Sequence, residues 1–149
     1  MFRFHGKTAA EGRWARRVER RHGSRRGATT VEFAIVCPLL FTLFCGAIEY
    51  GRCNQIINAV ALSSYQGCRR AIVPGATAAN TTAAVNGVLS ANLITGATVT
   101  INPTTITDAT EEVTVTVSVN INNNAWITPT FTAGKTITRS CTLTREKTN

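Results

Sequence analysis

The dominant feature of the hydrophobic pattern is an uncharged apolar run near the start of the chain. From Phe33 to Ile48, sixteen consecutive residues carry no charged side chain. The longer segment from Ala28 to Ile48, which includes Glu32, has 21 residues. At about 1.5 Å per residue these make a helix of roughly 30 Å, enough to cross the hydrocarbon core of a bilayer. The pattern therefore predicts one membrane-spanning helix, with a single carboxylate, Glu32, near its start.

Beyond this run the helix is predicted to continue outside the membrane. Apolar residues recur there with helical spacing, at Ile56, Ala59 and Val60, widened by Ile57 and Ala61. Pro74-Gly75 should end this helix after Ile72.

A second, shorter helix is expected from about Thr77 to Leu93, with Gly96 as its stop signal. Its apolar residues share one face: Val85, Val88, Leu89 and Leu93.

The last third of the chain alternates with a period of two residues, which is the pattern of strands. In Glu112–Ile121 the apolar side chains point one way, and the Thr, Ser and Asn side chains point the other way. Shorter alternations predict strands at Val99–Ile101 and Ile137–Leu143, although Arg139 interrupts the second. Such faces suit an antiparallel sheet packed on helices. The expected fold class is α+β, with a long N-terminal helix, a short helix and a sheet of about three strands.

The net charge of +8 is concentrated before the apolar run. Residues 1–27 contain nine Lys and Arg and two Glu, whereas residues 28–149 contain seven basic and six acidic residues. A basic arm of this kind can bind nucleic acid, but here it stops where the apolar run begins. The positive-inside rule therefore favours a cytoplasmic leader, and we expect no nucleic-acid partner.

The start of the apolar run resembles the cleavage site of type IV prepilins and pseudopilins. The shared features are Gly27, followed by Ala28-Thr29-Thr30-Val31-Glu32 and an apolar helix. In that family a prepilin peptidase cuts after the glycine, and a glutamate stands at the fifth mature position. The resemblance implies cleavage between Gly27 and Ala28, and pairing of Glu32 with the new Ala28 amine during assembly.

The continuation is similar to the TadE-like pseudopilins of tight-adherence (Flp-type) pilus systems. The matching pieces are Val31-Glu32-Phe33-Ala34, Pro38-Leu39-Leu40 and Glu49-Tyr50-Gly51, with a further likeness at Gly67–Ala71. This resemblance implies a minor pilin or pseudopilin that takes part in assembling a bacterial pilus. The implied partners are the prepilin peptidase, other pilins, the pilus assembly platform and inner-membrane lipid.

Together these features divide the chain into three segments. Residues 1–27 are expected to be a cleaved cytoplasmic leader, and 28–72 a single-pass inner-membrane helix with an extracytoplasmic extension. Residues 73–149 are expected to form a small extracytoplasmic α+β domain. The competing interpretation is an uncleaved, membrane-anchored extracytoplasmic binding module. The sequence does not distinguish entry into the surface pilus from priming it or assisting its assembly.

Three cysteines, Cys53, Cys68 and Cys141, lie outside the expected span. Export would permit a disulfide, and the favoured pair is Cys68 on the long helix with Cys141 on the last strand. Both histidines of the chain, His5 and His22, lie in the leader. No Cys-x-x-Cys or phosphate-binding glycine motif occurs. We therefore expect no catalytic, cofactor or metal site.

The segment between the last two predicted strands carries three large apolar residues: Trp126, Ile127 and Phe131. Two interpretations stay open for them. They form an exposed contact surface, or they close over the edge of the sheet.

Overall fold

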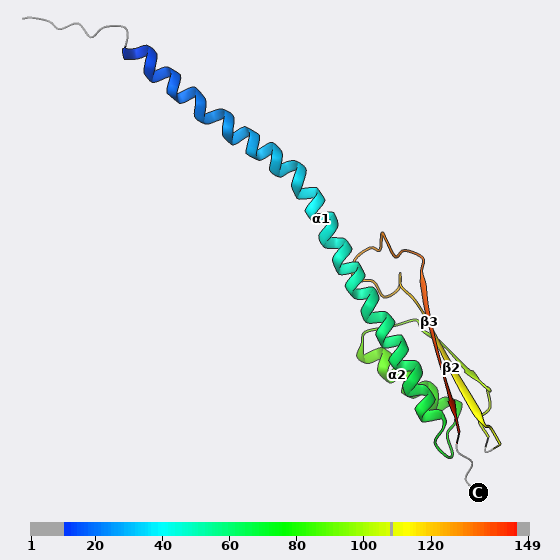
Figure 1. Ribbon diagram of the computed structural model, residues 1–149. Helices are drawn as coiled ribbons and strands as arrows, with labels where there is room; N and C mark the ends of the chain where they lie inside the picture. The colour runs from blue at the N-terminus through cyan, green and yellow to red at the C-terminus, as the bar shows by residue number, and fades with distance from the viewer. Residues whose placement is uncertain (1–10, 108, 146–149) are drawn as a thin grey trace, which may run out of the picture. The chain divides into compact units, whose positions relative to one another are not determined.

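The computed structural model describes residues 11–107 and 109–145, with side chains described from Gly27 onward. The chain folds as two helices followed by three strands (Figure 1): α1 (Glu11–Ala71), α2 (Ala78–Ala91), β1 (Thr98–Asn102), β2 (Glu112–Asn120) and β3 (Thr136–Thr144). The predicted α+β class and the three-stranded sheet are confirmed.

Two compact units share this chain, Met1–Phe44 and Cys45–Asn149. Helix α1 belongs to both, and it continues through Pro38, where the Thr42 hydroxyl donates a hydrogen bond of 2.9 Å to the Pro38 carbonyl. The helix begins at Glu11, which is before the start of the helix predicted from the apolar run at residue 28. It ends at Ala71, just before the predicted break at Pro74-Gly75.

The sheet has the order β1-β2-β3 with antiparallel neighbours. Val115 is opposite Ile101 on one side and Cys141 on the other, which fixes the register. The valines of β2 are fully buried and alternate with half-buried Thr and Ser, as the period of two predicted. Across the outer face, hydroxyls pair between strands, for example Thr114 with Thr142 at 2.9 Å. Arg139 is exposed on β3, so the charge that interrupts the apolar alternation stays in water.

The hydrophobic core lies between the inner face of the sheet, α2 and the second half of α1. Ile56, Ala59 and Val60 are buried, and Ile57 packs against them, as their spacing predicted. Ala61 is exposed, so including it in the buried stripe was wrong. The buried face runs on instead through small residues that let the helix approach its neighbours closely: Ser63, Ser64, Gly67, Cys68 and Ala71.

Helix α2 begins at an N-cap, Thr77, whose hydroxyl accepts a hydrogen bond from the Asn80 N–H at 3.2 Å. Its end differs from the prediction. Leu93 lies outside the helix with a φ of +54°, and it is 75% exposed. The N–H of Ile94 donates to the Leu89 carbonyl at 3.0 Å. This closes a Schellman motif in which Leu93 occupies the left-handed position usually taken by glycine. The predicted stop signal, Gly96, lies three residues further on.

Gly67 lies where α1, α2 and β2 meet most closely. A Cβ at this position would lie 2.6 Å from Cγ2 of Val85 and 3.1 Å from Cγ1 of Val115, and both valines are fully buried. Gly67→Ala should therefore destabilise the domain by up to about 2 kcal/mol. Overpacking costs roughly 1–3 kcal/mol, and the helix preference of alanine over glycine offsets about 1 kcal/mol. Denaturant unfolding of the detergent-solubilised protein measures the change.

The matched control is Gly87→Ala in α2, where an added Cβ meets nothing within 4 Å. That variant should be neutral or slightly stabilised. Truncating Val85 to alanine in the Gly67→Ala background should recover part of the lost stability. Equal stability of Gly67→Ala and the wild type would show that no close packing exists there.

Candidate functional site

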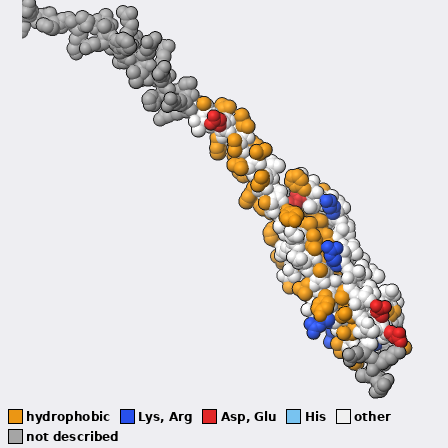
Figure 2. Space-filling view, in the orientation of Figure 1, with side chains coloured by type: hydrophobic (Ala, Val, Ile, Leu, Met, Phe, Trp, Pro, Cys, Tyr) orange, Lys and Arg blue, Asp and Glu red, His pale blue; other side chains and the backbone are white. Residues whose placement is uncertain are grey.

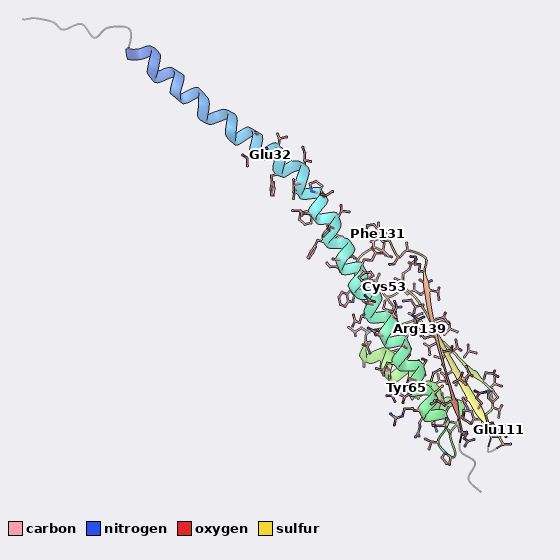
Figure 3. All side chains as sticks on the ribbon, viewed as in Figure 1. Glu32, Cys53, Tyr65, Glu111, Phe131 and Arg139 are labelled. Carbon is pink, nitrogen blue, oxygen red and sulfur yellow. The ribbon has the colours of Figure 1, made fainter. Side chains whose placement is uncertain are left out.

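The predicted processing motif lies on α1, where its side chains are exposed. Gly27, Ala28 and Glu32 are all helical and exposed, and Glu32 projects from the helix in Figure 3. Ala28 and Glu32 are four residues apart, so they share one face of the helix. An amine at Ala28 would therefore lie within one helical turn of the Glu32 carboxylate.

Gly27 has no packing role among the described residues. A Cβ added there meets nothing within 4 Å. A glycine inside a helix costs roughly 0.5–1 kcal/mol relative to alanine. No described neighbour therefore requires a residue without a side chain at this position.

The apolar run after the motif exposes its side chains on every side of the helix. Each of the following is between 48% and 71% exposed: Val31, Phe33, Ile35, Val36, Leu39, Leu40, Phe41, Leu43 and Phe44. Figure 2 shows hydrophobic side chains along the visible surface of this part of α1, with white atoms between them. A helix that is apolar all round requires an apolar surrounding. Among the described residues, this helix alone is long and apolar enough to cross a membrane.

Directly after the apolar run, Glu49 holds the loop between β2 and β3. The carboxylate is only 5% exposed and accepts hydrogen bonds from a single turn of that loop. Phe131 N–H donates at 3.0 Å and Thr132 N–H at 2.6 Å, while the N–H of Thr130 donates at 3.2 Å. The hydroxyls of Thr130 and Thr132 also donate, at 3.3 Å and 2.6 Å. Five donors thus compensate the charge that burial removes from water.

Arg52, one turn further along α1, holds the first part of the same loop and also the turn after α2. Its Nε donates to the Asn124 carbonyl at 2.9 Å, and Nη2 donates to the Leu93 carbonyl at 3.0 Å. The guanidinium also lies over the Trp126 ring, 5.0 Å from its centroid. Buried Asn124 links the two loops, because its side-chain Oδ1 accepts from the Thr95 N–H at 2.8 Å. We call Glu49, Arg52 and these loop contacts the charged clamp.

Hydrogen bonding makes the charged clamp sensitive to acid. The Thr132 hydroxyl and, to a smaller extent, the backbone N–H groups of residues 130–132 lower the pKa of Glu49 from 4.5 to about 2, against the opposing effect of burial. A carboxylate whose folded pKa is depressed stabilises the fold above its unfolded pKa. That contribution is lost as the pH falls toward the folded pKa.

Between about pH 4.5 and pH 2, the wild type should therefore lose stability that Glu49→Gln has already lost at neutral pH. Thermal unfolding of the detergent-solubilised protein, followed from about pH 7 to pH 3, measures how the stability of the wild type and of Glu49→Gln changes with pH. Thr132→Val removes the hydroxyl that lowers the pKa of Glu49 most, so it should narrow the pH range over which stability is lost. Thr132→Ser keeps the hydroxyl and should leave that pH range unchanged. The same acid dependence in Glu49→Gln as in the wild type would contradict this role of the carboxylate.

The structure brings the two cysteines of the predicted disulfide together. Cys68 is fully buried on α1, and its Sγ lies 2.8 Å from the carbonyl oxygen of Cys141 on β3. Both are free thiols in this structure, so the bond stays a prediction. Burial, reinforced by the neighbouring Cys141 thiol, raises the pKa of the Cys68 thiol to about 12, which suppresses the thiolate that exchange chemistry needs.

Non-reducing peptide mapping of exported protein should recover a Cys68–Cys141 peptide pair. Cys68→Ser with Cys141→Ser should lower the free energy of unfolding by a few kcal/mol, because the bond would close a long loop. Cys53→Ser is the control, since that cysteine should stay reduced. Free thiols at both Cys68 and Cys141 in exported protein would contradict the pairing.

Within the described part of the chain, no group of three His, Cys, Asp or Glu residues is placed to hold a metal ion. Trp126 and Phe131 are each 63% exposed, so the interpretation that they close over the edge of the sheet was wrong for both. The contact-surface interpretation fits them better. Each ring touches α1 with part of its surface, at Arg52 or Gly46, and exposes the rest.

Sequence reasoning missed the clamp itself. Glu49 was noted only as part of a terminal motif, and Arg52 was given no role. One signal could have found them: two residues of opposite charge, one turn apart, directly follow a membrane-length apolar run. Charges at that position must be paired or hydrogen-bonded. Their loop partners could not be found in the same way, because Thr130–Thr132 and Asn124 lie over seventy residues away.

Comparison with known families supports the resemblance at the N-terminal helix. The sequence model of the family described as TadE-like protein matches residues 27–69. No match is found among curated proteins or solved structures. The match begins at Gly27, includes the whole apolar run and contains both charged residues of the clamp. Over residues 27–69, the chain is therefore similar to the TadE-like protein family.

Proposed function

We propose that the chain is a minor pilin or pseudopilin of a bacterial tight-adherence pilus system. A prepilin peptidase removes residues 1–27, the apolar part of α1 is anchored in the inner membrane, and the domain that follows lies outside the cytoplasm. The role is structural rather than enzymatic. Its partners are the peptidase, other pilins and the assembly platform, with membrane lipid around the helix.

The observation that carries this proposal is the TadE-like match that begins at Gly27. Three features of the molecule support it. Gly27 is a glycine that no described neighbour requires, Glu32 is exposed one helical turn from Ala28, and the apolar helix is uncovered on all sides. The excess of positive charge before the span favours a cytoplasmic leader.

N-terminal sequencing of the protein extracted from membranes tests the proposal. In a host with the peptidase, the mature chain should begin at Ala28. In a matched host without the peptidase, it should begin at Met1 or Phe2. A full-length N-terminus in both hosts would instead support the uncleaved, membrane-anchored binding module.

A further inference from the structure

Exposed apolar side chains gather at one end of the domain, around the charged clamp. Tyr50 is 69% exposed, Leu93 75%, and Trp126 and Phe131 63% each. They come from α1, from the turn after α2 and from the loop before β3. We call these four residues the apolar collar. Figure 3 shows Phe131 at the end of the domain opposite Glu111.

Phe131 places the collar relative to the apolar run. Residues Cys45–Ile48 are the last part of the run, and they belong to the same compact unit as the collar. A Cβ built on Gly46 would lie 3.4 Å from Cε2 of Phe131, so the ring packs directly against this residue. Gly46 lies two residues before the end of the run, which corresponds to about 3 Å along the helix. The Phe131 ring is therefore level with residues that the bilayer must surround.

The other collar residues lie slightly further out. Tyr50 lies two residues after Ile48, and Arg52 lies four residues after Ile48. These separations correspond to rises of about 3 and 6 Å along the helix. The Leu93 carbonyl and the Trp126 ring are both bound by Arg52, at 3.0 Å and 5.0 Å. The headgroup region on one side of a bilayer is roughly 5–7 Å deep. Aromatic residues are enriched at this depth, where an apolar ring with a polar edge is favoured.

Leu93 provides independent support. Its φ of +54° lies in the left-handed region. This conformation is roughly 1 kcal/mol less favourable for a residue with a Cβ than for glycine. The leucine side chain is the most exposed of the large apolar side chains in the described domain. The Leu93 backbone serves the Schellman motif and accepts from Arg52, but neither role requires a leucine side chain, which is exposed here. The exposed side chain therefore points to a contact outside the domain.

We propose that the apolar collar inserts into the extracytoplasmic interface of the bilayer that holds α1, and so seats the domain on the membrane. In the charged clamp, the side chains of Glu49 and Arg52 form hydrogen bonds with backbone atoms of both collar segments. These bonds fix the segments to α1 and leave the collar side chains exposed to lipid. The inference rests on the membrane span of the proposed function.

Quenching of tryptophan fluorescence by brominated phosphatidylcholine tests the proposal in vesicles containing the full chain. Trp14→Phe leaves Trp126 as the single tryptophan. In the Trp14→Phe, Trp126→Phe background, single tryptophans replace Phe131, Phe44 or Tyr65. Tyr65 is the matched control, because it is half-exposed on the same helix but 15 residues beyond Tyr50, a rise of about 22 Å. Fluorescence should be quenched at positions 44, 126 and 131 and unaffected at position 65.

The outcomes separate the two proposals. Quenching at position 44 but at neither 126 nor 131 would overturn the collar and leave the membrane span in place. Absence of quenching at position 44 would overturn the span and the collar with it. Cross-linking of collar positions between copies, together with unquenched collar tryptophans, would assign the surface to a second copy and overturn insertion into lipid.

Two further variants test the side chains while preserving the fold. Leu93→Gly relieves the left-handed strain, and Phe131→Ser keeps the N–H that binds Glu49. Both should fold with undiminished stability and should reduce quenching of Trp126. Unchanged quenching in both variants, with the fold intact, would show that the collar side chains do not hold the domain at the bilayer.

Discussion

Replacing Gly27 by phenylalanine is expected to abolish removal of residues 1–27 and leave only the full-length precursor in the membrane. We expect the proposed peptidase to accept only a small residue before the bond that it cuts, so a phenyl ring at this position should block cleavage. The substitution should not disturb the chain itself, because the space around Gly27 is open. Immunoblotting of membrane fractions resolves precursor from mature chain, and N-terminal sequencing identifies the start of each.

The matched control introduces the same side chain elsewhere on the same exposed helix. Ile35→Phe replaces a residue that is 71% exposed, so it should insert normally and be cleaved normally. Gly27→Ala adds only a methyl group and should slow processing less than phenylalanine. Efficient cleavage of Gly27→Phe at the same bond would remove the reason for assigning the glycine a role in processing. Loss of the Gly27→Phe protein from the membrane fraction would show an insertion defect instead.

The fold was predictable wherever one residue pattern had one physical meaning. The alternation in β2 predicted a strand because only a half-buried strand places Val113, Val115 and Val117 on one side. The end of α1 was predictable because Pro74-Gly75 cannot continue a helix. At the end of α2, the rule that favours glycine pointed to Gly96. Helix α2 ends at Ala91 instead, and Leu93 takes the left-handed position, because hydrogen bonds from Arg52 and within the Schellman motif outweigh the strain.

The candidate site also has one part that local sequence patterns predict and one part that they do not. Gly27, Ala28 and Glu32 could be proposed from the sequence because the motif that they form depends on local spacing alone. The clamp depends on contacts between residues far apart in the chain, such as Arg52 with Asn124. The exposure of Trp126 and Phe131 depends on the same long-range contacts, because Glu49 and Arg52 bind backbone groups in the loop that carries both rings. Local patterns do not contain that information, so the collar became visible only in the folded domain.

Glu32→Ala is expected to leave insertion and cleavage intact while strongly reducing filament assembly. In an isolated membrane helix the carboxylate is a cost, and removing it should be harmless or mildly favourable. In the proposed assembly, the carboxylate neutralises the Ala28 amine of the same or a neighbouring subunit among apolar helices. Leaving a charged amine without its partner in such a site costs at least about 2 kcal/mol. That is roughly a 30-fold weaker addition of subunits.

The substitutions at Glu32 separate charge from size. Glu32→Gln keeps the length but loses the charge, so it should assemble as poorly as Glu32→Ala. Glu32→Asp keeps the charge with a shorter reach, so it should be intermediate. Paired measurements on the same cells, immunoblotting for cleavage and electron microscopy for filament number, distinguish assembly from processing. Normal filament numbers from a stably expressed, cleaved Glu32→Ala protein would remove the assembly role of this carboxylate and favour a helix that serves only as an anchor.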